Sequence, residues 1–260
     1  MTNNNQDGPL QKKCVVFLDI LGFKELVISA SKDCEKAQSL EDVLRKIEKI
    51  GSVKENLIDT ADVTIFSDSV VISVDQNHDI FSELIERLAT MMWTLMCDGV
   101  WMRGGVAIGL LSNSSHRPWG PAFIEAYETE TRLAVHPRLV FSRKAFDWLS
   151  ESIDVSDLPI KRDKTDGIYF IDVVGQGVDR LRDDPGASLH FAKIREHLNI
   201  GYSQATDNPS VFRKYSWLCR EWDRTLGSKQ ANYSIDLEPF YSDARQDSAG
   251  DFDIATLPSI

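Results

Sequence analysis

The chain has 260 residues, a formal net charge of −11 and 42% hydrophobic residues. That apolar fraction suffices for a buried core, and the acidic balance excludes a general nucleic-acid surface, which needs a basic stripe. Four widely spaced cysteines, none in a Cys-x-x-Cys pair, indicate neither zinc nor disulfides. The polar start lacks an apolar targeting segment, and no run approaches the roughly 18 apolar residues of a membrane helix, so we expect a cytoplasmic protein.

Residues 14–23 combine a buried strand with an acidic residue and a glycine turn. Their sequence, CVVFLDILGF, begins as a short strand buried on both faces. Asp19 lies inside that strand, where a carboxylate costs free energy unless it is used. Gly22 stands where the strand turns into a helix beginning near Lys24, and a glycine lets the backbone approach a ligand closely. The combination indicates a site for a cation and a phosphate.

A second acidic turn follows in residues 62–74. Two β-rich runs are separated by Ser67, Asp68 and Ser69, which predicts a tight hairpin with Asp68 at its tip. If this hairpin lies beside the first strand, Asp19 and Asp68 converge. Two carboxylates with few other protein ligands are typical of magnesium or manganese bound to a nucleoside triphosphate. The alternative for Asp68 is turn chemistry alone, which is the commoner role of an aspartate in a hairpin.

The first half of the chain predicts a ferredoxin-like arrangement. After a disordered lead at residues 1–12, we expect a helix at 24–50 that is broken near 29–36, a helix at 79–97 and a strand at 101–111. Arg103 lies on the face of the last strand opposite its apolar neighbours. The resulting order is βαββαβ, an α/β (α+β) fold in which the first strand and the hairpin are neighbours.

The second half predicts more helix. We expect helices at 120–134 and 144–152, strands at 138–142 and 168–174, and an exposed connection at 154–166. Residues 13–175 would form one domain, 176–240 an aromatic-rich helical appendage on the core or on a second subunit, and 241–260 a disordered acidic tail. No Gly-x-Ser-x-Gly elbow accompanies the five histidines, for which surface roles are expected.

Several segments resemble the catalytic core of class III nucleotidyl cyclases. These are Asp19-Ile-x-Gly-Phe, the hairpin with Asp68, and the strand RGGVAIG at residues 103–109, in that order. The segments SDSVV (67–71), GPAFIEAYETE (120–130) and KYSWL (214–218) look like the bacterial pyrimidine (uridylate/cytidylate) cyclases of the Pycsar antiphage defence system. The likeness covers residues 14–145 and, more weakly, the rest of the chain.

The resemblance implies a reaction and a set of site residues. A cyclase joins the ribose 3′ oxygen to the α-phosphorus and expels pyrophosphate. Asp19, Asp68 and the backbone carbonyl of Ile20 would hold two Mn²⁺ or Mg²⁺ ions. The amides of Leu21, Gly22 and Phe23 would face the β- and γ-phosphates, and the Phe23 ring would pack against the sugar or, as an alternative, the core.

The sequence departs from purine cyclases of this class at four positions. Ile124 and Glu128 stand where those enzymes have a ribose-binding asparagine and a transition-state arginine. Arg132 and Arg103 are the candidate substitutes, with a surface salt bridge as the alternative role of either. Thr64 and Arg117 stand where the purine-reading lysine and aspartate lie. A short hydroxyl opposite a long donor fits a pyrimidine, with UTP slightly favoured over CTP.

The leading hypothesis is therefore a homodimeric, metal-dependent pyrimidine nucleotide cyclase with active sites at the subunit interface. The resemblance implies that its cyclic product acts on a separate effector protein in bacterial antiviral defence, with no nucleic-acid or membrane partner. The alternative is a catalytically inactive, cyclase-like nucleotide-binding module, which the missing asparagine and arginine allow. A purine or diguanylate cyclase is disfavoured by the absent purine contacts.

Overall fold

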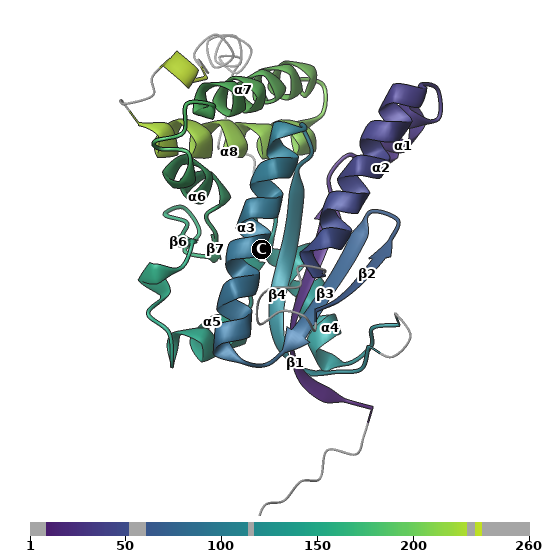
Figure 1. Ribbon diagram of the computed structural model, residues 1–260, viewed down its shortest axis with the longest axis vertical. Coiled ribbons are helices and arrows are strands. Elements are labelled where there is room, and N and C mark those ends of the chain that lie inside the picture. The colour runs from purple at the N-terminus through teal and green to yellow at the C-terminus, as the bar shows by residue number, and fades with distance from the viewer. Residues whose placement is uncertain (1–8, 52–60, 114–116, 228–231, 236–260) are drawn as a thin grey trace, which may run out of the picture.

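Strand β1 (Gln11–Ile20) lies at the centre of the sheet in a computed structural model, which describes residues 9–51, 61–113, 117–227 and 232–235 (Figure 1). The other strands of the described part are β2 (Asp62–Phe66), β3 (Ser69–Asp75), β4 (Met102–Leu111), β5 (Leu139–Phe141), β6 (Ile160–Arg162) and β7 (Tyr169–Ile171). The helices are α1 (Phe23–Ala30), α2 (Cys34–Glu48), α3 (His78–Cys97), α4 (Pro121–Leu133), α5 (Arg143–Ser150), α6 (Val173–Arg180), α7 (Ala187–Gln204) and α8 (Pro209–Leu226), with short 3-10 turns at Lys49–Gly51 and Val155–Asp157.

The strand order confirms the ferredoxin-like prediction. Within the described residues the order is β2-β3-β1-β4-β5-β7-β6, and β1 pairs antiparallel with both β3 and β4. The first four strands thus form the βαββαβ unit, with α1 and α2 between β1 and β2 and with α3 between β3 and β4. Strand β5 then adds to β4 in parallel, and the β6–β7 hairpin extends the same sheet.

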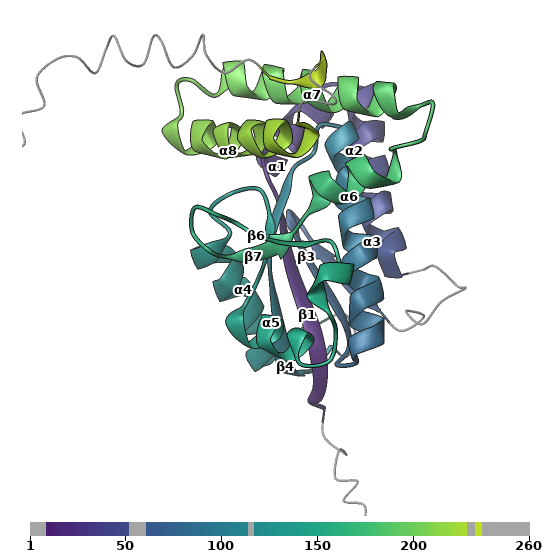
Figure 2. The same ribbon diagram turned by 90° about the vertical axis from the view of Figure 1, so that its left-hand side faces the viewer.

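The two faces of β1 are covered by different helices. Val16, Leu18 and Ile20 belong to the main core, which α2 and α3 cover, whereas Val15 and Phe17 belong to a smaller core closed by α4. Figure 2 shows α3 and α4 on opposite sides of the strands. Because side chains alternate along a strand, Asp19 lies on the α4 face.

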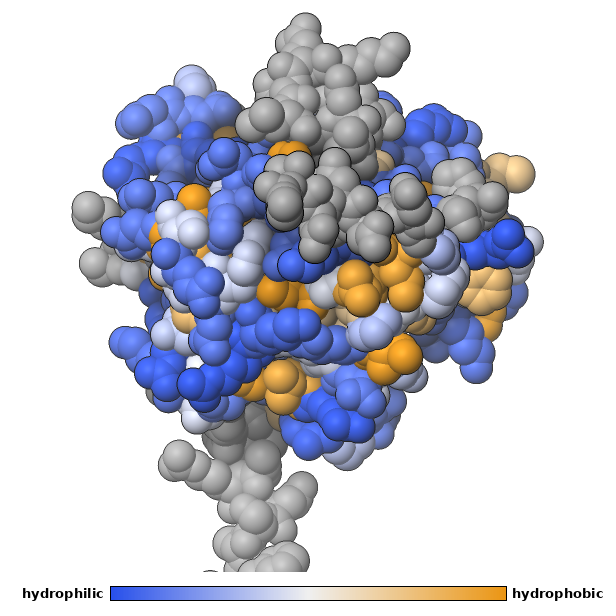
Figure 3. All heavy atoms as spheres, turned by 90° about the horizontal axis from the view of Figure 1, so that it is seen from below, coloured by the Kyte–Doolittle hydropathy of each residue, from blue (hydrophilic) through white to orange (hydrophobic). Residues whose placement is uncertain are grey.

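The C-terminal helices α7 and α8 lie together at one end of the sheet, where β1 ends and β4 begins (Figures 1 and 2). They share the main core, since the ring of Trp222 stacks on Trp93 of α3 and contacts Phe191 of α7. The opposite end of the molecule is largely hydrophilic, with apolar side chains in small separate groups (Figure 3). The division that the sequence suggested at residue 176 falls within α6.

Four expectations need correction or lie outside the described residues. The strand expected at 168–174 is limited to β7, and helix α6 begins at Val173. The segment 154–166, expected to be an exposed connection, contains β6 and the buried Asp163. The lead was set at 1–12, but β1 begins at Gln11; residues 1–8 and the expected tail at 241–260 lie outside the described part.

The four histidines in the described residues, His78, His136, His190 and His197, are half-buried and so less exposed than expected; His78 stacks on Trp148 and His136 stacks on Trp217. None of the helices in the described ranges combines the length and the apolar character that a membrane crossing requires.

The close approach of α4 to β4 depends on Gly105. A Cβ atom at this position would lie 2.2 Å from the backbone oxygen of Ala126 and 2.6 Å from the backbone nitrogen of Glu130. We therefore expect Gly105→Ala to push α4 away from the sheet and to lower the free energy of unfolding by about 1 to 3 kcal/mol. Urea denaturation followed by tryptophan fluorescence measures this change. Gly186→Ala, which meets only the end of the Asp184 side chain, is the control and should be nearly neutral.

Candidate active site

The backbone brings Asp19 and Asp68 to the same end of the sheet. In the β1–β3 pairing Asp19 lies opposite Ser69, the residue that follows Asp68. The amide of Ile20 donates a hydrogen bond of 2.9 Å to the backbone oxygen of Asp68. Ser67, with φ of 58°, and Asp68 form the two-residue turn between β2 and β3. The hairpin expected from the sequence is confirmed, and it places Asp68 beside the end of β1.

Arg103 joins Asp19 to a second carboxylate. Asp19 and Arg103 are opposite each other in the β1–β4 pairing, and the Arg103 Nε lies 3.0 Å from Asp19 Oδ2. The Nη2 of the same guanidinium lies 2.8 Å from Glu130 Oε1 on α4, and its Nη1 donates a 3.5 Å hydrogen bond to the backbone oxygen of Ala134. One arginine therefore bridges the face of the sheet and the helix above it.

Glu130 is almost fully buried, with 4% of its side chain exposed. Burial raises the pKa of this carboxyl above its ordinary value, and Arg103 opposes that shift. The sequence reasoning assigned no role to Glu130, although a signal existed. Ala122, Ala126 and Glu130 recur every four residues and thus share one helix face, which is the buried one.

Lys214 of α8 adds a fourth charged group to this cluster. Burial lowers the pKa of its ammonium group, Arg103 lowers it further, and Asp19 and Glu130 oppose the shift. The four side chains come from β1, β4, α4 and α8, which are distant in the sequence. Sequence reasoning had placed Lys214 only in a motif and had given it no role.

The three residues expected to meet phosphates lie at the start of α1. The Leu21 amide is already used, because it donates a 2.9 Å hydrogen bond to the backbone oxygen of Trp101. Gly22 is exposed and adopts the left-handed conformation, with φ of 73°, as the N-cap of the helix. The side chains of Leu21 and Phe23 pack against the main core. This packing favours a core role for the Phe23 ring over contact with the sugar. Of the three backbone amides expected to face phosphates, those of Gly22 and Phe23, at the start of the helix, are the two that are left for this role.

Thr64 lies on the same face of the sheet as Asp19. It pairs with Val71, which in turn pairs with Phe17, two residues before Asp19. With strands about 4.8 Å apart and a rise of about 3.3 Å per residue, the Thr64 and Asp19 backbones are roughly 12 Å apart. The Thr64 hydroxyl is buried and has no hydrogen-bond partner within the described ranges.

The remaining candidate residues stand apart from this cluster. Arg117 is exposed in the segment before Trp119. The side chain of Arg132 is 72% exposed and pairs with Glu128 at 3.2 Å, one turn earlier on α4. Ile124 is 57% exposed on the same helix. Within one chain, Arg132 therefore forms a surface salt bridge, which is the alternative to a catalytic role for this residue.

The residues at the end of β1 are suitable for a hard divalent cation. The backbones of Asp19 and Asp68 are close together, so both carboxylates could serve one site, and the remaining ligands would come from backbone, substrate and water, as is usual for magnesium. In the parts of the chain that the structure describes, no cluster of three or more histidine, cysteine, aspartate or glutamate side chains could hold a metal ion. Arg103 contacts Oδ2 of Asp19, so a cation bound to that oxygen would compete with the guanidinium.

Comparisons with known proteins yield only remote structural similarity. No protein-family model and no curated protein matches the chain. An adenylate/guanylate cyclase/hydrolase from Silicibacter pomeroyi is 13% identical, and the match covers 62% of this chain and 94% of that protein with a TM-score of 0.39. A bacterial light-regulated adenylyl cyclase is 20% identical, and the match covers 54% of this chain and 45% of that protein with a TM-score of 0.36. A class III adenylyl cyclase-like ATP-binding protein from Pseudomonas aeruginosa is 13% identical, and the match covers 77% of this chain and 44% of that protein with a TM-score of 0.39. The chain therefore spans less than half of the last two proteins.

The raised pKa of Glu130 predicts how the free energy of unfolding should depend on pH. The unfolded carboxyl loses its proton near pH 4.3, whereas the folded one keeps it to higher pH, so folding becomes less favourable as pH rises through this interval. Glu130→Gln removes the titration and resembles the protonated form. We expect the stability of this variant relative to the wild type to increase from pH 4 to pH 7 in urea denaturation. A difference that stays constant or reverses would show that Arg103 outweighs the effect of burial.

Proposed function

We propose that this protein is a metal-dependent pyrimidine nucleotide cyclase that converts UTP, or CTP, to the 3′,5′-cyclic monophosphate and pyrophosphate. The observation that carries the proposal is the position of Asp19, on the α4 face, beside the turn that contains Asp68, with two cationic side chains near Asp19. We further propose that the product is a second messenger for a separate effector protein in bacterial antiviral defence. That role rests on the resemblance of the sequence motifs.

The reaction requires negative charge to be neutralised at the phosphates. The ribose 3′ oxygen forms a bond to the α-phosphorus, the bond from that phosphorus to the β-phosphate oxygen breaks, and pyrophosphate leaves. The proton of the 3′-hydroxyl passes to water. Mn²⁺ or Mg²⁺ ions, two per site, held by Asp19, Asp68 and the carbonyl of Ile20 would supply Lewis-acid chemistry when bound.

The side chains of the chain itself would position and neutralise the substrate. Glu130 holds Arg103 through a 2.8 Å ion pair, so the guanidinium would stay at the start of β4 if Asp19 bound a cation. Arg103 is then a fixed positive charge beside the triphosphate, as a group that stabilises a phosphoryl-transfer transition state should be. The amides of Gly22 and Phe23 at the start of α1 would face the phosphates.

The base would lie toward β2. The roughly 12 Å between the Thr64 and Asp19 backbones spans the distance from the phosphates to the base of a nucleotide. The buried Thr64 hydroxyl has no partner within the described ranges, and a carbonyl or imino group on the edge of a pyrimidine would supply one. Arg117 is the second proposed contact to the base.

We also propose that the active enzyme is a homodimer with its sites at the interface. Helix α4 leaves Ile124 and Tyr127 exposed, and Phe66 on the uncovered side of β2 is 80% exposed. Large exposed apolar side chains of this kind are typical of protein interfaces. Because Arg132 is at the surface of its own chain, it would act as a catalytic residue only in the site of the partner subunit.

The proposed function is tested by incubating the full chain with each of the four ribonucleoside triphosphates and Mn²⁺, and by identifying any cyclic product by mass. A cyclic pyrimidine monophosphate is the expected product. Binding of a triphosphate without turnover would instead support the inactive nucleotide-binding module. That alternative has a specific basis in Ile124 and Glu128, which replace the ribose asparagine and the transition-state arginine.

Asp19→Asn and Asp68→Asn should each lower the cyclisation rate by roughly 100-fold or more, because an amide keeps the shape but removes a negative ligand. The product is quantified by chromatography. Asp75→Asn is the matched control: it lies on β3 at the far end of the sheet, pairs with Lys13 at 2.7 Å, and should retain activity. Normal turnover in either site variant, with the fold intact, would contradict the assignment of both aspartates to the metal ions.

Thr64→Val tests the proposed contact to the base. The substitution keeps the β-branched shape and removes the hydroxyl, so the preferred pyrimidine triphosphate should bind about 1 to 3 kcal/mol more weakly. The ratio of kcat/KM for UTP and CTP, measured for both proteins, reports the change in discrimination. An unchanged ratio in a folded variant would mean that Thr64 serves only as a strand residue.

A further inference from the structure

Helix α8 is fixed near the start of β4 by two aromatic contacts, made by residues that follow Lys214 within the next turn. Tyr215 packs edge-to-face on Trp101, with ring centroids 6.2 Å apart. Trp217 stacks on His136, with centroids 5.4 Å apart and an angle of 4° between the rings. Trp101 lies two residues before Arg103, and His136 lies two residues after Ala134, whose carbonyl accepts from Arg103. These contacts hold α8 next to the charged cluster.

A buried polar network fixes the same helix more firmly. The indole nitrogen of Trp217 donates a 3.1 Å hydrogen bond to Asp163, which also accepts a 2.6 Å bond from Arg138. One turn further along α8, Glu221 lies 2.6 Å from the Nζ of Lys161. Because Arg138 and Asp163 are both about 2% exposed, removal of Arg138 would leave the buried carboxylate of Asp163 without its ion-pair partner. Helix α8 is therefore a rigid part of the sheet domain.

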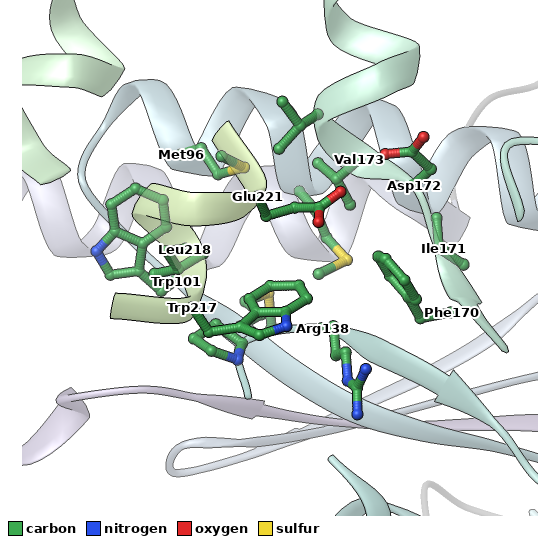
Figure 4. Close-up of a pocket in the computed structure, with 14 residues that line it drawn as sticks. Met96, Trp101, Arg138, Phe170, Ile171, Asp172, Val173, Trp217, Leu218 and Glu221 are labelled. Carbon is green, nitrogen blue, oxygen red and sulfur yellow. The ribbon is translucent and has the colours of Figure 1, made fainter. Parts of the chain in front are cut away.

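The cavity beneath α8 is too small to be the ligand site. It has a volume of about 30 Å³ and lies between Trp217, Phe170 and Glu221, with the guanidinium of Arg138 on the side away from Glu221 (Figure 4). A volume of this size holds one or two waters, since one water needs about 10–15 Å³. We therefore look for a ligand site near Lys214 instead, whose charge interacts with those of Asp19, Arg103 and Glu130.

Lys214 differs from the other half-buried lysine on this side of the protein. The charge of Lys161 is met by Glu221 at 2.6 Å and by Asp172 at 3.7 Å. Lys214 is half-buried too, but within the described ranges it forms neither a hydrogen bond nor a salt bridge. A partly desolvated ammonium group without a paired anion is unfavourable, and an anionic ligand would satisfy it.

We propose that Lys214 contacts the phosphate chain of the substrate, so that helix α8 contributes directly to the active site. This inference rests on the proposed function and extends it to a residue outside the βαββαβ unit. With a metal ion held by Asp19, Arg103 and Lys214 would be two organic cations beside the site. Glu130 balances only one of them. The other remains available for the β- or γ-phosphate, whose negative charge increases as pyrophosphate leaves.

The test uses inorganic tripolyphosphate with Mg²⁺ as the probe, which has no base and undergoes no cyclisation. Calorimetric titration of the full-length protein compares the wild type with Lys214→Gln, Lys214→Arg and Arg213→Gln. Arg213 is the matched control because it is exposed, adjacent on the same helix and carries the same charge. We expect Lys214→Gln to weaken binding about tenfold or more, and Lys214→Arg and Arg213→Gln to stay within about threefold of the wild type.

The outcomes separate this inference from the proposed function. Equal affinities of folded Lys214→Gln and Arg213→Gln would overturn it and would give Lys214 only a structural role, visible as a change in urea midpoint. Absence of tripolyphosphate binding in the wild type would overturn it as well. Lys214-dependent binding without any cyclic product would support the phosphate contact while refuting the cyclase. In an active enzyme, Lys214→Gln should also lower kcat/KM far more than Arg213→Gln does.

Discussion

The burial of β1 on both faces is the constraint on which the site depends. Residues 14–18 are buried and pair on one side with β3 and on the other with β4, so the register of the whole unit is set around them. A slip by one residue would exchange the two cores and would move Asp19 to the other face. The packing of Val15 and Phe17 against α4 therefore also determines which helix Asp19 faces.

Charge balance at the end of β1 follows from that register. Opposite-charge pairs across neighbouring strands are favourable, and here Asp19 is directly opposite Arg103. Glu130 then anchors the guanidinium from above at 2.8 Å, although the burial of its carboxylate is unfavourable. The arginine thus has two anions, of which only Asp19 is available to a metal ion. Arg103 can lose Asp19 as a partner and still be held in place by Glu130.

The sequence predicted those parts of the site that depend on local patterns. The alternation of apolar residues and the Ser67–Asp68 turn were sufficient to place Asp68 beside Asp19, because the βαββαβ order makes β1 and β3 neighbours. Glu130 and Lys214 were given no roles because their positions depend on contacts between distant segments. A helix periodicity shows which residues share a face, but it does not show which strand that face meets.

The errors in the second half have similar causes. Strand β6 has only three residues in an acidic, proline-containing segment, so its composition resembled a loop. Helix α6 begins with two valines and contains Gly175 and Gly177, all poor helix formers. Tertiary packing outweighs these propensities, since a Cβ atom at Gly177 would lie 2.1 Å from the ring of Trp93. The glycine that weakens the helix locally is what allows α6 to approach α3.

The loss of the arginine expected on α4 and the rigid attachment of α8 can be understood together. In this chain the buried turn of α4 carries an anion, Glu130, and its one arginine in the last turn, Arg132, faces solvent. In the proposed site, positive charge for a phosphate chain would therefore come from other elements of the same subunit or from a partner. Under this proposal β4 would supply Arg103, and α8, which the buried Asp163 helps to anchor, would supply Lys214. If α8 only covered the core, its aromatic contacts would be sufficient. A half-buried, unpaired lysine beside two carboxylates would then be an unfavourable feature without a structural role.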